Sequence, residues 1–329
     1  MPPLQIGMFI PRGVGDPRRY GQPDYKQIVR YGQRADELGF DSLWVPDHFF
    51  IERPKGTLHP YPEAWTTMTA LVMRTERAKV GSMVLAASFR HPALLAHMAG
   101  ALQELADGRL ILGVGTGNQP IEHEAFGLGF EGRVGRFEEY LRILTALLRN
   151  EVVSLQGRHY RVQEAQLLRR VPPVPVWVAA SGERMLGLAA RYARGWNGGA
   201  ASTVDGEPLV SKLAALREAC RTIGRDPAEL EISSFTTVIV SPNTAHAAET
   251  VEKLQEINGG ISAEDVRARY VLGTPDQVVE GLEKLVGWGV NHLIVSHGAH
   301  PSSLWSDDTL DLFARAVLPA LRADLAATW

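Results

Sequence analysis

Asp47 and His48 are the two side chains best suited to proton chemistry, because they stand together at the end of a short apolar run. The run, Ser42–Val45, stops at Pro46 and is followed by a long loop. Histidine can give or take a proton near neutral pH, and an adjacent acid can position it or balance its charge. This order predicts a buried strand that presents an acid and an imidazole to a ligand.

Glycine and small polar residues follow another predicted strand, where a ligand could approach the backbone. Gly113, Gly115 and Gly117 do not form a dinucleotide fingerprint, because the third glycine comes one position too early. The segment also lacks the lysine of a phosphate-binding loop. Glycine allows a flat ligand to approach a strand end closely, so the segment up to Asn118 predicts a ring-binding surface. A glycine-rich barrel corner without a ligand is the alternative.

Ser181 and Gly182 precede a predicted helix that begins near Arg184. Free backbone N–H groups at a helix start, together with a serine hydroxyl, suit an anionic group such as phosphate. A helix cap without any ligand is the other interpretation of the same residues.

Eight strand-then-helix units follow one another along the chain and predict a (β/α)8 barrel, the TIM-barrel fold. A doubly wound open sheet is the alternative, but it would show fewer units and a glycine fingerprint in the first crossover. In a barrel the carboxyl ends of the strands meet at one edge, which would bring Asp47, His48, Asn118 and Ser181 together. The predicted strands cover residues 4–11, 42–45, 78–87, 109–114, 174–180, 195–199, 230–240 and 290–296.

The whole chain, 1–329, is predicted to form a single domain with two insertions. A Gln-Gly turn between two short β-prone runs predicts an inserted hairpin at about 152–172. A polar and mostly helical stretch predicts a second insertion at about 243–272.

Composition argues against several other classes of protein. The formal net charge of −3 gives no indication of nucleic acid or anionic membrane as a partner. The single cysteine, Cys220, excludes an internal disulfide and is typical of a reducing compartment. No apolar run is long enough to cross a bilayer, and the first residues lack the pattern of a signal peptide, so the cytoplasm is the expected location.

Several motifs resemble those of the bacterial luciferase-like family, which comprises flavin monooxygenases and oxidoreductases that use the deazaflavin coenzyme F420. They occur in family order across nearly the whole chain. The Asp-His pair and the Gly-Thr-Gly segment resemble the F420 branch more than the branch that uses FMN. The motifs are Leu38-Gly-Phe-Asp-Ser-Leu-Trp44, Asp47-His-Phe49, Arg90-His-Pro92, Gly108-Arg-Leu-Ile-Leu-Gly-Val-Gly-Thr-Gly117, Glu124-Ala-Phe-Gly127, Arg136-Phe-Glu-Glu139, Ala180-Ser-Gly182, Gly195-Trp-Asn197 and Leu272-Gly-Thr-Pro275.

The resemblance implies a (β/α)8 barrel with F420 in its mouth, or FMN as the alternative. It also implies a non-proline cis peptide bond, which by position would join Met83 and Val84. Ser181, Gly182, Arg184 and Met185 match positions that hold the phosphate and tail of the cofactor. The residues implied beside the ring are Asp47, Met83, Val84, Ala86, Thr116, Gly117 and Asn118.

His48 resembles the family histidine beside the site of hydride transfer, where it can exchange a proton or polarise a substrate oxygen. In sugar-phosphate dehydrogenases of the family a glutamate follows Gly-Thr-Gly, whereas Asn118 stands here. An amide cannot take a proton at neutral pH, so the sequence does not support that substrate. His48 is therefore expected to act without an acid/base partner.

The expected activity is hydride transfer between F420 and a small organic substrate, with Trp65, Trp196 and His297 as candidate substrate contacts. An FMN-dependent monooxygenase is the first alternative, and a non-catalytic flavin-binding protein is the second. His297 and His300 suggest a metal site, but strand one offers no His-x-His, so no metal is expected. The family resemblance also implies a homodimer, and a flavin or F420 reductase is a possible electron supplier.

Overall fold

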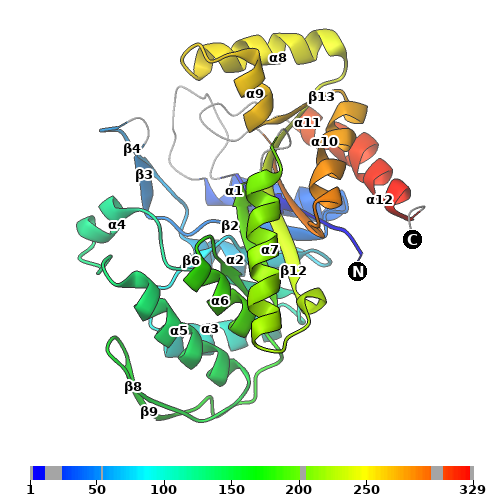
Figure 1. The fold of residues 1–329 in the computed structure, drawn as a ribbon. Coiled ribbons are helices and arrows are strands. Elements are labelled where there is room, and N and C mark those ends of the chain that lie inside the picture. Colours follow the sequence, from blue (N-terminus) through cyan, green and yellow to red (C-terminus); the bar gives the residue numbers. More distant parts are fainter. Residues whose placement is uncertain (1–2, 12–23, 53–54, 201–204, 298–306, 327–329) are drawn as a thin grey trace.

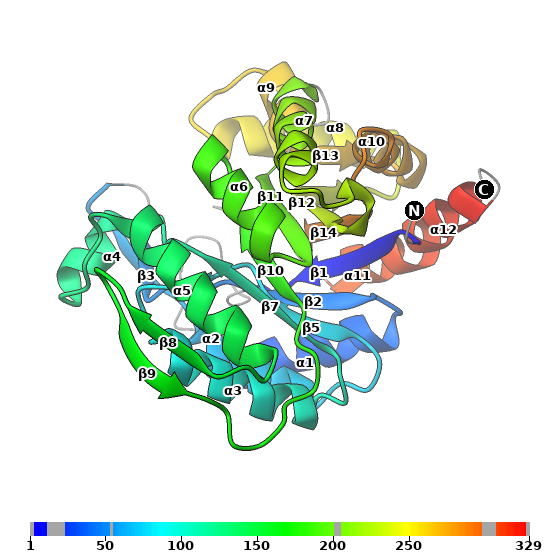
Figure 2. The same cartoon turned by 60° about the horizontal axis from the view of Figure 1, so that its bottom comes forward.

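Eight parallel strands close into a ring in the computed structural model, which describes residues 3–11, 24–52, 55–200, 205–297 and 307–326. Neighbouring strands pair in chain order; β1 pairs with β14, and β7 with β10, so the ring has no gap (Figures 1 and 2). The predicted (β/α)8 barrel is confirmed. The strands are β1 (Gln5–Phe9), β2 (Ser42–Val45), β5 (Lys79–Ser82), β7 (Leu110–Gly115), β10 (Val176–Ala179), β11 (Gly195–Ala200), β12 (Glu231–Val240) and β14 (His292–His297).

The barrel strands carry nearly continuous apolar runs because both of their faces are covered. All four residues of β2 and all six residues of β7 and of β14 are buried. Two tryptophans, Trp44 and Trp177, fill the barrel interior with ring centroids 5.1 Å apart. Gly81 leaves the space for Trp44, since a Cβ at this position would lie 2.6 Å from the indole.

Helices surround the ring and cover the outer faces of the strands. Their starts agree with the sequence: Asp24 and Glu63 accept hydrogen bonds from the first turns of α1 and α2, and proline opens α3 and α10. The outer helices are α1 (Tyr25–Glu37), α2 (Ala64–Val72), α3 (Pro92–Leu105), α5 (Arg133–Leu148), α6 (Glu183–Tyr192), α7 (Glu207–Thr222), α10 (Pro275–Gly287), α11 (Asp307–Leu312), a π-helical turn η2 (Phe313–Val317) and α12 (Leu318–Ala326).

Smaller elements interrupt the regular alternation of strands and helices. The hairpin of β8 and β9 lies along the outer side of α5, and α8 and α9 form a separate layer at one end of the molecule (Figures 1 and 2). These elements are β3 (Phe50–Glu52), β4 (Leu58–Pro60), β6 (Leu85–Ala86), α4 (Pro120–Ala125), β8 (Val153–Gln156), β9 (Arg161–Ala165), the 3-10 turn η1 (Pro227–Glu229), α8 (Thr244–Ile257), α9 (Ala263–Arg269) and β13 (Val271–Gly273).

The third barrel strand differs from its prediction. Residues 78–87 predict one continuous strand, but β5 ends at Ser82 and β6 begins at Leu85. The peptide bond between Met83 and Val84 is cis, at the position that the family resemblance implied. In the described residues, no helix is both long enough and apolar enough to span a membrane.

Candidate active site

A cavity of about 270 Å³ lies at the carboxyl ends of the barrel strands, where β2, β5, β6, β7, β10 and β11 end. Small-molecule sites commonly measure roughly 300–1,000 Å³, so this cavity suits one ring system rather than a whole dinucleotide-sized ligand. The predicted residues that line it are His48, Asp47, Met83, Val84, Ala86, Thr116, Gly117 and Asn118. The other residues that line it are Phe89, Gly115, Glu122, His123, Ala179, Asn197 and Gly199.

His48 is held by a buried carboxylate. Its Nδ1 lies 2.9 Å from Oε2 of Glu122, whose side chain is 1% exposed. The other carboxylate oxygen of Glu122 accepts hydrogen bonds from the backbone N–H groups of Phe49 and Phe50, at 2.6 and 3.1 Å. Because the carboxylate fixes Nδ1, it leaves Nε2 as the ring nitrogen of His48 that can act on a ligand.

The expectation that His48 has no acidic partner beside it is therefore wrong. Glu122 lies on α4, a single short helix that the sequence pattern did not separate from the longer helix α5. The carboxylate comes from this helix rather than from the position directly after the Gly-Thr-Gly segment, where Asn118 stands. Nothing in the sequence around Asp47 and His48 predicts that Glu122, 74 positions away from His48 in the chain, lies beside the imidazole.

Asp47 is buried at 6% exposure and fully engaged by donors. Its carboxylate accepts hydrogen bonds from Ala86 N at 2.9 Å and from two nitrogens of Arg90 at 2.7 and 3.2 Å. Burial raises the pKa of the Asp47 carboxyl group, while Arg90 opposes that rise. Arg90 also pairs with Glu63, the residue that caps α2. Asp47 thus joins the end of β2 to the segment that follows β6.

Glycines at the end of β7 allow neighbouring side chains to pack closely against the backbone there. A Cβ at Gly115 would lie 2.7 Å from Cγ2 of Val84, and one at Gly117 would lie 2.9 Å from the ring of His123. Gly117 also has φ +79°, a conformation that favours glycine. The space beside Gly115 and Gly117 is therefore taken by the side chains of Val84 and His123, and the close approach of a flat ligand to this strand end stays a prediction.

A match to a known family accompanies this geometry. Residues 4–261 match the family model described as luciferase-like monooxygenase, which is well over half of the chain. The chain belongs to the luciferase-like monooxygenase family. The family prediction made from the sequence motifs is confirmed.

Individual relatives match this luciferase-like chain over most of their length. F420-dependent glucose-6-phosphate dehydrogenase of Amycolatopsis mediterranei (strain U-32) is 30% identical over 322 residues, which cover 91% of this chain and 95% of that protein. 5,10-methylenetetrahydromethanopterin reductase of Methanolobus tindarius is 27% identical and covers 88% of this chain and 82% of its own. Among solved structures, monooxygenase RslO1 from Streptomyces bottropensis has a TM-score of 0.80 at 25% identity, over 96% of this chain and 99% of that one.

The residues matched to the phosphate and tail of a cofactor lie beside the cavity rather than in it. Ser181 and Gly182 are exposed and directly precede α6, whose first-turn N–H groups donate no hydrogen bond to a capping side chain. Arg184 is exposed on the same turn and pairs with Glu138 of α5 at 2.8 Å. Met185 is half-buried and packs against the core.

The three candidate substrate contacts do not line this cavity. Trp196 is 0% exposed and donates its indole N–H to the carbonyl oxygen of Ala180, within the core between strands and helices. The ring of His297 packs against Phe40 and Phe313, on the outer side of β14. Trp65 packs on the core from α2. The prediction is wrong for Trp196 because its neighbour Asn197 is the residue that faces the cavity.

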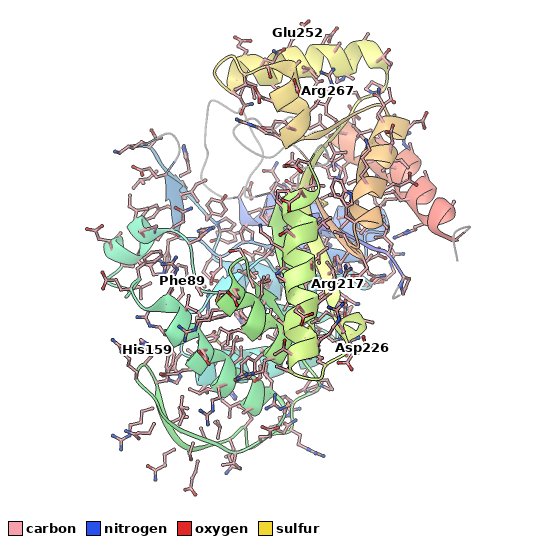
Figure 3. The ribbon with its side chains drawn as sticks, in the orientation of Figure 1. Phe89, His159, Arg217, Asp226, Glu252 and Arg267 are labelled. Atoms are coloured by element: carbon pink, nitrogen blue, oxygen red, sulfur yellow. The ribbon has the colours of Figure 1, made fainter. Side chains whose placement is uncertain are left out.

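An aromatic wall next to His48 is a further feature that the sequence did not predict. The ring centroid of Phe49 lies 4.1 Å from that of Phe126 and 4.5 Å from that of Phe89. His123, which bonds to Ser88 at 2.7 Å, continues this wall. Phe89 lies on the side of the barrel covered by α4 and α6 (Figure 3). Of these rings, Phe89 and His123 line the cavity, whereas Phe49 and Phe126 are exposed, at 37% and 53%.

Among the described residues, no group of three or more histidine, cysteine or acidic side chains is arranged so that it could hold a metal ion. His300 lies outside the described residues. Burial lowers the pKa of His297 to about 3.

Proposed function

We propose that the chain is an oxidoreductase that transfers a hydride between the deazaflavin coenzyme F420 and a small organic substrate. One observation carries this proposal: a glutamate-anchored imidazole, His48, lines a ring-sized cavity at the carboxyl ends of the barrel strands. Relatives named as F420-dependent dehydrogenases support it, because they align over about nine-tenths of this chain. The F420 dependence of these relatives is the reason to prefer F420 to FMN.

The cavity residues fit a flat ring. Asp47, Met83, Val84, Ala86, Thr116, Gly117 and Asn118 would border it, and Ser181, Gly182, Arg184 and Met185 would hold the phosphate end. When bound, F420 supplies the hydride acceptor or donor of the reaction. The protein positions the ring and presents one face of it to the substrate.

His48 is the proposed proton-handling residue. Its Nε2 would donate a proton to, or accept one from, a substrate oxygen, while Glu122 keeps Nδ1 protonated and balances a positive charge on the imidazole. Phe89 would shield this exchange from water on its side of the cavity.

The proposed substrate is not a sugar phosphate. Asn118 lines the cavity where sugar-phosphate dehydrogenases of the family are expected to have a glutamate. The strand-six segment 195–201 carries no lysine that could hold a phosphate group. A small neutral alcohol or carbonyl compound is the class that agrees with both features.

Cofactor titration tests the proposal against its main rival, an FMN-dependent monooxygenase. F420 and FMN are each titrated into the protein, and binding is followed by the fluorescence of the cofactor. We expect tight binding of F420 and weak binding of FMN. Tight FMN binding without F420 binding would show that the rival is correct.

Replacing His48 tests catalysis against the second alternative, a non-catalytic flavin-binding protein. His48→Ala should retain F420 binding and lose turnover by about 10²- to 10⁴-fold, the usual contribution of general acid–base catalysis. His97→Ala, on the exposed side of α3, is the control. A wild-type protein that binds F420 but turns over no alcohol or carbonyl compound would support the binding protein instead.

Several features of organisation belong to the same proposal. We propose a single domain over 1–329, with the hairpin at about 152–172 and the helical segment at about 243–272 as insertions. We further propose a cytoplasmic homodimer that works with a separate F420 or flavin reductase. Light scattering and fractionation of the producing cells would test these points.

A further inference from the structure

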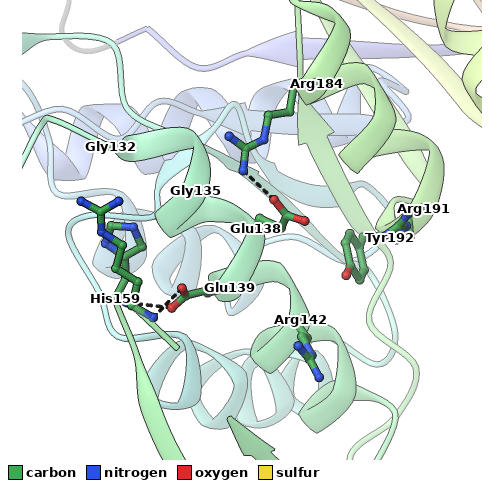
Figure 4. Close-up of a pocket in the computed structure, with 10 residues that line it drawn as sticks. Gly132, Gly135, Glu138, Glu139, Arg142, His159, Arg184, Arg191 and Tyr192 are labelled. Carbon is green, nitrogen blue, oxygen red and sulfur yellow. Dashed lines mark hydrogen bonds and ion pairs between the residues drawn. The ribbon is translucent and has the colours of Figure 1, made fainter. Parts of the chain in front are cut away.

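A second cavity, of about 590 Å³, lies outside the barrel between α5, α6 and the tip of the β8–β9 hairpin (Figure 4). We call it the arginine groove. Four arginines line it, together with two glutamates, which gives the lining a net charge of +2 in a chain of net charge −3. The arginines are Arg142 of α5, Arg158 of the hairpin, and Arg184 and Arg191 of α6.

Most of this positive charge is available to a ligand. Arg184 pairs with Glu138 at 2.8 Å, but both side chains are exposed, at 64% and 41%, so the pair is weak. Glu139 already accepts hydrogen bonds from the backbone N–H groups of residues 158–160. Within the part of the chain that the structure describes, Arg142, Arg158 and Arg191 form no ion pair with an acidic side chain.

The arginine groove begins close to the active-site cavity. Ala179, at the end of β10, lines the cavity, and Arg184, five residues later, lines the groove. Five residues span at most about 18 Å, so one extended ligand can reach both places. Phe89 of the cavity and His159 of the groove lie on the same side of α7 (Figure 3). From Arg184 the groove runs along α6 to Arg191 and Tyr192 at its other end.

We propose that the arginine groove binds the run of glutamate carboxylates that F420 carries beyond its phosphate. This inference rests on the proposed function, since it concerns the same cofactor. The cavity has room for a ring only, so the rest of the molecule must leave it, and the groove offers guanidinium groups along that exit. Guanidinium groups suit carboxylates because their planar N–H donors match both oxygens.

Dissociation constants of two cofactor forms test the groove directly. F420 with several glutamates and its form without glutamate are each titrated into the protein at low salt. We expect the wild type to bind the glutamylated form roughly 10-fold more tightly, as a few exposed ion pairs would allow. The double variant Arg142→Gln/Arg191→Gln should reduce this preference to about twofold or less, while its affinity for the glutamate-free form stays unchanged.

Two controls separate the groove from general charge. Arg161→Gln removes one positive charge from the same hairpin but outside the groove, and it should keep the preference. The double variant Arg142→Lys/Arg191→Lys keeps both positive charges, so it should retain most of the preference for the glutamylated form. The preference should also decrease between about 20 mM and 500 mM salt, since exposed ion pairs are screened.

The outcomes distinguish the two proposals. Equal affinity of the wild type for both forms, or a preference that survives in the double glutamine variant, would overturn the groove proposal and leave F420 dependence standing. If neither form binds, the proposed function itself fails.

Discussion

The contact between His48 and Glu122 determines what the imidazole can do. A carboxylate 2.9 Å from Nδ1 orients the ring and leaves Nε2 for a ligand, which is the geometry on which the proposed proton exchange rests. The two backbone N–H groups that bind Glu122 in turn fix the carboxylate. The loop after β2 and helix α4 are thereby held together at the reacting side of the cavity.

Glu122→Gln is predicted to separate catalysis from binding. The amide keeps the size of the side chain but removes the charge, so kcat should fall by about 10- to 100-fold while the F420 dissociation constant stays within about twofold. Glu122→Asp should recover part of the lost kcat. Steady-state kinetics and fluorescence titration measure these effects.

The matched control is Glu124→Gln, the same change at an exposed position of the same helix. It should leave kcat unchanged. A Glu122→Gln protein with wild-type kcat would mean that Glu122 only holds the loop in place.

At the scale of elements, strand order and strand ends were predictable, but the direction of single side chains was not. Apolar runs and glycine or proline boundaries predicted all eight barrel strands, and thereby the position of His48 and Thr116 at the mouth. Trp196 and Asn197 show the limit of this kind of prediction. Neighbouring side chains on a strand point to opposite faces. A prediction that is wrong by one residue therefore places a core side chain in the cavity.

Glu122 and the interruption of the third strand show a second limit of prediction from the sequence. Helix α4 has six residues, too few for a helical period to be recognised in the sequence. The ending of β5 at Ser82 depends on backbone geometry rather than on residue pattern, and only the family resemblance indicated it.

Asp36 at the end of α1 connects this helix to the start of β5, at the opposite end of the barrel from the active site. Its buried carboxylate accepts hydrogen bonds from the N–H groups of Glu76, Arg77 and Ala78, at 2.9, 3.2 and 2.6 Å. Asp36→Asn should lower the free energy of unfolding by about 2–4 kcal/mol, because hydrogen bonds to a charged acceptor contribute about 1.5–3 kcal/mol each. Urea unfolding measures this loss.

The exposed neighbour Glu37 provides the comparison, since Glu37→Gln should change the unfolding free energy by no more than about 0.5 kcal/mol. Folded Asp36→Asn protein should bind F420 as the wild type does. Equal unfolding midpoints for the two variants would contradict the role given to Asp36.

For the molecule as a whole, two buried histidines make stability depend on pH. Burial lowers the pKa of His292 and of His297 from 6.5 to about 3. The unfolded chain therefore takes up protons between about pH 6.5 and pH 3 that the folded protein does not. The contribution of these two histidines to the free energy of unfolding is present in full above pH 6.5 and decreases as the pH falls through this range.

His292→Gln should remove one of these two contributions. His292 lies among Trp44 and Trp177 and bonds to Ser42 at 2.7 Å, so the variant loses stability at pH 7. Its unfolding free energy should then decrease less steeply with acid, by about 1.4 kcal/mol per pH unit between pH 6 and pH 4. Urea unfolding at several pH values measures the slope, and an unchanged slope would contradict the assignment. His97→Gln, at an exposed position on α3, is the control.

The pairing of β1 with β14 has a consequence for how the protein is made. Gln5 lies opposite His292 and Met8 lies opposite Val295, so strands from the two ends of the sequence complete the ring together. A ribosome must therefore synthesise almost the entire chain before the free edge of β1 can be covered. Until then the growing barrel exposes unpaired strand edges to other proteins. Slow translation of the last hundred or so residues would lengthen this aggregation-prone interval, and a chaperone that shields strand edges would shorten the exposure.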